Sequence, residues 1–158
     1  MRSEKKRVKV VLAHPPDFER AWEIVGEYND AVGVVERDDR VSFLEYFQPP
    51  GALWLAELDG ALAGCVALRP LELRQAACEV KRLYVRPQRR GIGIAAALME
   101  AVEQYARAER FQFIYLDTFE VLAAAVRFYT NRGYAEVDRY NDNPQATIFM
   151  RLDLRALG

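Results

Sequence analysis

The chain has 158 residues, of which 51% are hydrophobic and 28% are charged. This length suits one domain, expected to span residues 1–158, and the composition is that of a globular protein rather than a disordered or fibrous one. The formal charge of −1 gives no support to nucleic-acid binding. No apolar run approaches the roughly 20 residues that cross a bilayer. We therefore expect neither a nucleic-acid nor a membrane partner.

The cysteine and histidine content narrows the chemistry further. Cys65 and Cys78 are not in a Cys-x-x-Cys spacing, so we interpret them as free thiols of a reducing compartment. The basic N-terminus is followed by an apolar stretch too short for a signal peptide, which favours a cytoplasmic location. His14 is the one histidine of the sequence, and a single histidine argues against a His-based metal site. We therefore expect no metal.

Hydrophobic periodicity and turn residues divide the chain into short elements. In chain order, we expect a strand over 7–13, a helix opening at 16–17, a short helix after residue 39, strands over 53–58, 61–68 and 76–85, a helix over 93–110, a strand over 113–116, a helix over 120–132, and strands over 134–137 and 145–154. Asp59-Gly60 is a two-residue hairpin signal, which makes the strands around it antiparallel. The β-α-β unit over 76–116 should be parallel, with a right-handed crossover. This order predicts an α/β domain with a mixed sheet and helices on both faces.

A basic, glycine-containing turn joins the strand over 76–85 to the helix that follows it. Gly91 and Gly93 would let backbone N–H groups approach an anion without interference from a β-carbon. The helix start adds free N–H donors and the positive end of the helix dipole. The pattern is that of a pyrophosphate-binding turn, although the spacing alone equally fits a plain tight turn.

The residues from Gly91 to Ala96 also fit the Gly-x-Gly-x-x-Ala dinucleotide fingerprint, with Asp117 ending the next strand. Two observations count against a dinucleotide-binding domain. The preceding strand carries three charged residues between positions 79 and 82, whereas a central strand of a doubly wound sheet is nearly all apolar. The motif also lies past mid-chain, which leaves no room for a second β-α-β half.

Two motifs resemble those of the GNAT superfamily of acyl-CoA-dependent N-acyltransferases. Gln88-Arg-Arg-Gly91-Ile-Gly93 is similar to the acyl-CoA-binding motif Gln/Arg-x-x-Gly-x-Gly/Ala of that family. The segment Ala125-Val-Arg-Phe128-Tyr129-Thr-Asn-Arg-Gly133-Tyr134 is similar to its second motif, Ala-x-x-(Leu/Phe)-Tyr-x-x-x-Gly-(Phe/Tyr). The order of the elements is also the order in the family, so the resemblance covers the whole chain.

The resemblance implies a fold and an acyl donor, acetyl-CoA. The fold would be a central twisted, mostly antiparallel sheet with one parallel, splayed pair, 76–85 and 113–116, and with helices on both faces. Pantetheine would lie between the splayed strands, and the pyrophosphate on the glycine turn. The implied acetyl-CoA contacts are Leu83, Tyr84, Val85, Gln88, Arg89, Arg90, Gly91, Ile92, Gly93, Ile94 and Ala95. Many family members carry an Asn seven residues before the motif Tyr, where this chain has Leu122.

In the family, the acceptor amine attacks the acyl thioester directly, in a ternary complex. An alkyl ammonium has a pKa of about 10 and must first lose a proton, and the leaving thiolate gains from a proton donor. The resemblance implies Tyr129 as that donor, although an aromatic residue packed on its helix gives the same pattern. It also implies Glu79 as the base, directly or through water. An ion pair of Glu79 with Lys81 or Arg82 is the structural alternative.

The acceptor is left open by the sequence. In the superfamily the first helices and the last hairpin loop line the acceptor cleft, and this chain offers there Asp38, Asp39, Glu45, Tyr46 and Asn141–Asn143. The acidic residues weakly favour a cationic amine, which would be a small molecule or a peptide. An acyl-CoA-binding regulatory domain without transfer is the alternative function. The last strands would also allow a homodimer.

Overall fold

The structure is a computed structural model that describes residues 7–72, 76–119 and 123–157. Its strands are β1 (Val8–Leu12), β2 (Ala52–Leu58), β3 (Ala61–Glu72), β4 (Ala76–Val85), β5 (Phe113–Thr118), β6 (Ala135–Val137) and β7 (Ile148–Asp153). Its α-helices are α1 (Phe18–Val32), α2 (Arg40–Phe43), α3 (Ile94–Ala108) and α4 (Ala123–Asn131). The strands form one sheet in the order β1-β2-β3-β4-β5-β7-β6.

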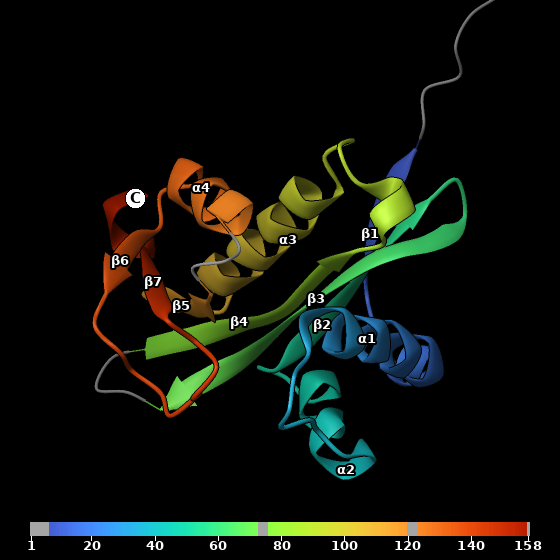
Figure 1. Cartoon of the computed structure of the whole chain (residues 1–158), viewed down its shortest axis with the longest axis horizontal. Helices are drawn as coiled ribbons and strands as arrows, with labels where there is room; N and C mark the ends of the chain where they lie inside the picture. The colour runs from blue at the N-terminus through green and yellow to red at the C-terminus, as the bar shows by residue number, and fades with distance from the viewer. Residues whose placement is uncertain (1–6, 73–75, 120–122, 158) are drawn as a thin grey trace, which may run out of the picture.

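The sheet is mixed, and helices cover both of its faces. Among the described strands, β4 and β5 form the one parallel pair, and every other neighbouring pair is antiparallel. Helices α1 and α2 lie on one face of the sheet, and α3 and α4 lie on the other (Figure 1). The predicted architecture, a mostly antiparallel sheet with one parallel pair and helices on both faces, is therefore confirmed.

Alternation along the central strands builds a separate core on each face, since successive side chains of a strand point to opposite sides. On β3, Val66 and Leu68 belong to the core beneath α3, whereas Cys65 and Ala67 belong to the core beneath α1. Residue positions on these strands therefore tell which face of the sheet a side chain occupies. Glu79 and Asp117, described below, lie on the α1 face, because Val80 and Leu116 beside them belong to the core beneath α3.

The parallel pair opens along its length. Strands β4 and β5 are paired only at Ala77–Phe113, Cys78–Ile114 and Glu79–Tyr115, yet β4 continues to Val85 and β5 to Thr118. Beyond Glu79 the backbone groups of β4 that face β5 have no strand partner in the described part of the chain. The predicted splay of this pair is therefore present, and it leaves a gap with backbone donors and acceptors on one side.

A bulge in β4 accompanies this opening. Cys65 faces Tyr84 and Ala67 faces Lys81, so that two residues of β4 oppose the single Val66 of β3. Arg82 has a φ of 62°, in the left-handed region that residues other than glycine seldom adopt. A bulge bends its strand and strengthens the local twist, which turns the end of β4 away from β5.

Strands β3 and β7 differ most from their expected boundaries, and β5 runs to Thr118 rather than ending at residue 116. Strand β3 runs on to Glu72 rather than ending at residue 68, because Arg69 and the residues after it pair with β4. Strand β7 begins at Ile148 rather than at 145, since Gln145 lies in the preceding loop and binds the loop after α1. Helix α4 is described from Ala123, so its expected start, including Leu122, lies outside the described residues.

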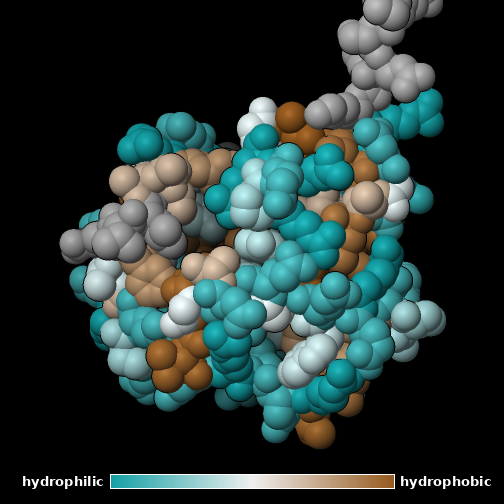
Figure 2. Space-filling model, turned by 45° about the vertical axis from the view of Figure 1, so that its right-hand side comes forward, coloured by the Kyte–Doolittle hydropathy of each residue, from teal (hydrophilic) through white to brown (hydrophobic). Residues whose placement is uncertain are grey.

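Hydrophilic side chains cover most of the molecular face in Figure 2, and the apolar residues on it form smaller patches between them. In the described part of the chain, no helix combines the length and the apolar character needed to cross a membrane.

Candidate active site

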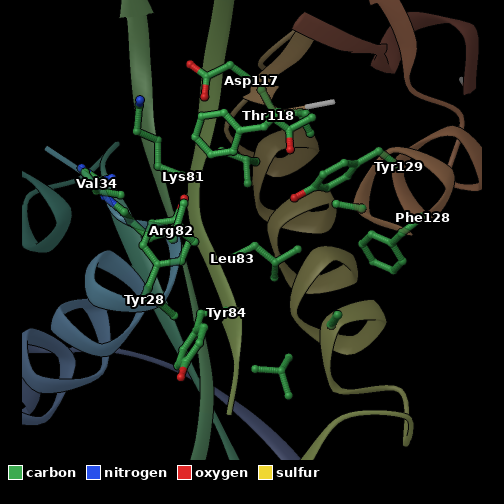
Figure 3. A pocket seen from close by; sticks show the side chains of 18 of the residues that line it. Tyr28, Val34, Lys81, Arg82, Leu83, Tyr84, Asp117, Thr118, Phe128 and Tyr129 are labelled. Atoms are coloured by element: carbon green, nitrogen blue, oxygen red, sulfur yellow. The ribbon is translucent and has the colours of Figure 1, made fainter. Parts of the chain in front are cut away.

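A large cavity opens where β4 and β5 separate. Its volume is about 1210 Å³, and its wall is formed by both strands, the turn before α3, helix α4, and two loops on the α1 face of the sheet. The side chains in Figure 3 reach it from α1, β4, β5 and α4. The segments that carry the two sequence motifs, far apart in the chain, therefore meet at one cavity.

The glycine turn forms one end of the cavity. Gly91 and Gly93 have φ values of 84° and 88°, and Gly93 is the N-cap residue of α3. A β-carbon built at either glycine would meet no atom within 4 Å, so the space beside the backbone is open. Open N–H groups at a helix start form a ready anion site, as the sequence predicts for the pyrophosphate.

Most of the predicted acetyl-CoA contacts line this cavity. The lining residues among them are Leu83, Tyr84, Val85, Arg89, Arg90, Gly91, Gly93, Ile94 and Ala95. Gln88 and Ile92 are not part of the wall, and Ile92 is 39% exposed. The guanidinium of Arg90 donates to the Val85 carbonyl at 3.1 Å, which ties the turn to the end of β4.

Tyr129 reaches the same cavity from α4, with its hydroxyl directed inward (Figure 3). The side chain is 8% exposed, and its ring packs edge-on against Phe128 and Tyr134. Burial raises the pKa of Tyr129 well above its ordinary value, and Tyr28 and Asp117 add to the rise. The hydroxyl therefore stays protonated at neutral pH. Tyr129 therefore has both features that the sequence analysis considered: its ring packs against other aromatic rings, and its hydroxyl faces the cavity.

Glu79 lies behind the cavity wall rather than in it. Its side chain is fully buried, and it accepts from Arg69 at 2.9 Å, from the Tyr140 hydroxyl at 2.6 Å and from Asn141 at 3.1 Å. Lys81 stands 3.6 Å away, whereas Arg82 pairs with Asp38 instead. Burial alone would raise the pKa of Glu79, but Lys81 and these donors hold the pKa below its usual range.

The predicted acceptor residues divide into two groups. Asp38 and the segment Asn141–Asn143 line the cavity. Asp39 instead caps α2, where its carboxylate accepts from the Ser42 amide at 2.7 Å. Glu45 and Tyr46 are not part of the wall, and Tyr46 is 2% exposed. Of the acidic residues expected there, Asp38 and Asp142 line the cavity, and Asp38 is paired with Arg82. Glu36 and Asp117 add two further carboxylates to the wall.

Arg69 and Tyr140 were not singled out by the sequence, and Asp117 was considered only for a dinucleotide site. Arg69 lies opposite Glu79 because β3 is longer than expected, and Tyr140 reaches Glu79 from the loop before β7. Asp117 also lines the cavity, and it accepts from Asn141 at 2.6 Å. The polar run Asn141-Asp142-Asn143-Pro144, next to Tyr140, was the available signal, but the sequence indicated only a hairpin loop at the acceptor cleft.

Neither cysteine is a candidate nucleophile. Both side chains are buried free thiols. Burial, followed by the nearby charge of Glu79, raises the pKa of Cys78 to about 12, and burial raises the pKa of Cys65 further still. A thiolate would be the reactive form, so acyl transfer through an enzyme thioester has no support.

Comparison with known proteins agrees with this geometry. The model of the acetyltransferase (GNAT) family matches residues 16–134. An uncharacterized N-acetyltransferase of Schizosaccharomyces pombe is 33% identical over 120 residues, which are 74% of this chain and 73% of that protein. A GNAT-family acetyltransferase from Staphylococcus aureus superposes with a TM-score of 0.79 at 19% identity, over 94% of this chain and 99% of that one.

A longer protein shares the fold as well. N-acetylglutamate synthase from Neisseria gonorrhoeae, solved with coenzyme A and N-acetyl-glutamate, superposes with a TM-score of 0.76 at 17% identity. The alignment covers 96% of this chain and 36% of the synthase chain. A mostly antiparallel sheet with one parallel pair also removes the basis for a doubly wound dinucleotide-binding domain, which is built on parallel strands. The chain belongs to the GNAT family of acyl-CoA-dependent acetyltransferases.

Proposed function

We propose that the protein transfers the acetyl group of acetyl-CoA to a primary amine by direct attack in a ternary complex. One observation carries the proposal: the glycine turn, the unpaired edge of β4 and the Tyr129 hydroxyl all border one cavity. In this arrangement the pyrophosphate would bind at Arg89–Ile94, and pantetheine would extend the sheet along β4. The thioester would then lie near Tyr129.

The chemistry follows from these positions. The free amine nitrogen forms a bond to the acetyl carbon and releases one proton to water, the carbon–sulfur bond breaks, and the thiolate takes a proton. Water returns a proton to the donor after the thiol has formed. Backbone N–H groups near the β4 bulge would stabilise the oxyanion of the tetrahedral intermediate. Tyr129, whose raised pKa keeps it protonated, would donate its proton to the departing sulfur.

For Glu79 we propose the structural interpretation. A general base works best with a pKa near the operating pH, and the pKa of Glu79 lies below even its usual range. Three donors and Lys81 already surround its carboxylate. In this role Glu79 fixes Lys81 and Asn141, which line the cavity, and does not receive the amine proton.

Glu79→Gln should therefore change kcat at neutral pH by less than about 10-fold and leave the pH profile of kcat unchanged. A base would instead give a fall of about 10²–10⁴-fold, partly recovered at high pH. Steady-state kinetics from pH 6 to 9 makes the distinction. Glu103→Gln is a matched control, because Glu103 is also a buried carboxylate paired with an Arg and a Tyr, away from the cavity.

Glu79→Gln should also change how the free energy of unfolding depends on pH. Because the folded-state pKa of Glu79 is lowered from 4.5, its ionised form stabilises the fold fully above the unfolded-state pKa. This contribution is lost as the pH falls through the folded-state pKa. We expect Glu79→Gln to lower the free energy of unfolding at pH 7 by roughly 1–3 kcal/mol. The difference from wild type should shrink below about pH 4, as measured by denaturant titration at each pH.

Thiol release from acetyl-CoA against a panel of amines tests the function itself. Turnover with at least one amine, together with acetyl-CoA binding by calorimetry, supports transfer. Acetyl-CoA binding without turnover of any amine would favour the regulatory alternative. NADH binding without CoA binding would contradict the assignment of the glycine turn.

A further inference from the structure

Opposite charges face the cavity from the two splayed strands. Lys81 and Asp117 each lie two positions beyond the last paired residues, Glu79 on β4 and Tyr115 on β5. Since side chains alternate along a strand, both project from the α1 face, and both line the cavity. They form no ion pair with each other, so the gap between the strands holds a cation and an anion apart.

The cavity wall on β3 and β4 carries more cationic side chains than carboxylates that pair with them. Three cations stand on β3 and β4, namely Arg69, Lys81 and Arg82. Arg69 and Lys81 share the single carboxylate of Glu79. The carboxylates of Glu79 and Asp38 pair with these three cations. An anionic group on a ligand could bind beside Lys81 and Arg82.

The Arg82 side chain lies in the cavity wall, and its Nε–H has no hydrogen-bond acceptor in the described part of the chain. Its side chain is 12% exposed, and its Nη2 lies 3.5 Å from the Asp38 Oδ2, longer than the 2.7–2.9 Å usual for a charge-assisted hydrogen bond. The Arg82 Nε and the Asp38 Oδ2 are both buried without a hydrogen-bond partner. A ligand carboxylate beside Arg82 would accept a charge-assisted hydrogen bond from its guanidinium.

The anionic side is Asp117. Its Oδ2 accepts from the side-chain amides of Asn141 at 2.6 Å and Asn143 at 3.4 Å, and in the described part of the chain it forms no ion pair. Burial is the main cause that raises the pKa of Tyr28 and of Tyr129, and the charge of Asp117 adds to both rises. Asp117 therefore lies close enough to the Tyr129 hydroxyl to affect it, near the proposed thioester position.

The loops over this end of the cavity are joined to each other. The Gln145 side chain donates to the Gly33 carbonyl at 3.0 Å and accepts from the Val35 amide at 3.1 Å. Gln145 and Val35 both line the cavity. This link connects the loop after α1 to the loop before β7 at this end of the cavity.

We propose that the acceptor is a small amine that also carries a carboxylate, an amino acid in chemical class. Its carboxylate would bind Lys81 and Arg82, and its amino group would lie at Asp117, facing the thioester. The inference rests on the proposed acetyl transfer and names its substrate class. A polyamine or an alkyl amine has no anionic group that Lys81 and Arg82 could bind.

The test compares matched acceptors in the thiol-release assay with the wild-type protein. Each common L-amino acid is assayed beside its primary amide and beside the amine that lacks the carboxyl group. Because hydrogen bonds to charged groups contribute about 1.5–3 kcal/mol, at least one amino acid should exceed its amide in kcat/KM by about 100-fold. Equal rates for acid, amide and amine would overturn the inference and leave the transfer function standing. Acetyl-CoA binding with no turnover would overturn the transfer function, and the inference with it.

Two variants locate the carboxylate. Arg82→Gln and Lys81→Gln should each raise KM for the best amino acid by about 10-fold or more, with KM for acetyl-CoA unchanged, whereas Lys81→Arg should keep most of the affinity. Lys9→Gln, the same substitution at an exposed position of β1, should have no effect. Loss of activity toward acid and amide alike in folded variants would contradict carboxylate binding. If either variant fails to fold, the acid-to-amide ratio of the wild type still decides.

Discussion

Gly93→Val should lower the affinity for acetyl-CoA by on the order of 100-fold, the equivalent of losing one or two hydrogen bonds to a charged group. The φ of Gly93 is 88°, a conformation that a β-branched residue adopts only with strain. The new side chain would also occupy the open space beside the backbone, where nothing lies within 4 Å of a built β-carbon. Calorimetric titration with acetyl-CoA measures the effect.

Gly60→Val separates the loss of binding from backbone strain. Gly60 has a φ of 84° and the same open surroundings, but it lies in the β2–β3 hairpin, away from the cavity. Both variants should lose similar stability, and only Gly93→Val should lose affinity. Unchanged affinity in Gly93→Val, or an equal loss of affinity in both variants, would contradict binding of the pyrophosphate at the glycine turn.

Local patterns were sufficient to predict the glycine turn and its place between a strand and a helix. The glycine turn, the strand before it and the helix after it are contiguous in the chain, so Gly91 and Gly93 could be placed from sequence alone. The splay of β4 and β5 came from the family resemblance. The bulge that accompanies it could not be predicted, because Arg82 has no local feature that requires its positive φ.

The surroundings of Glu79 depend on contacts that are distant in sequence. Arg69 is ten residues from Glu79 and follows the expected end of its strand at residue 68. Tyr140 is 61 residues from Glu79, in the connection between the last two expected strands. A charged residue on a strand can be recognised as unusual, but its partners depend on register and on how a loop folds back. The sequence therefore left two roles open for Glu79, and only its neighbours favour one.

Asp117 shows the same limit in another form. In the sequence it drew attention only as the acidic residue of a dinucleotide fingerprint. In the fold it stands on β5 opposite Lys81, and this relation exists because the two strands are neighbours in a parallel pair. Lys81 and Asp117 face each other only because of the strand order, and the residues next to each of them in the sequence do not indicate this.

Tyr129→Phe should lower kcat by on the order of 10²-fold, the low end for general acid catalysis, since solvent can replace the proton donor in part. The KM for acetyl-CoA should stay nearly constant, because the proton is needed only as the thiolate departs. The ring, which packs against Phe128 and Tyr134, is retained, so the loss of one hydroxyl should cost about 1 kcal/mol of stability. Steady-state kinetics with any working acceptor gives both parameters.

Tyr134→Phe is the matched control for this experiment. This substitution also removes one hydroxyl, from a neighbouring ring that is 2% exposed. The Tyr134 hydroxyl faces Glu103 rather than the cavity. Tyr134→Phe should lose stability comparable to that of Tyr129→Phe and keep its kcat. A kcat of Tyr129→Phe within about twofold of wild type corresponds to less than 0.5 kcal/mol of barrier. That result would leave Tyr129 as a packing residue and require another donor for the thiolate.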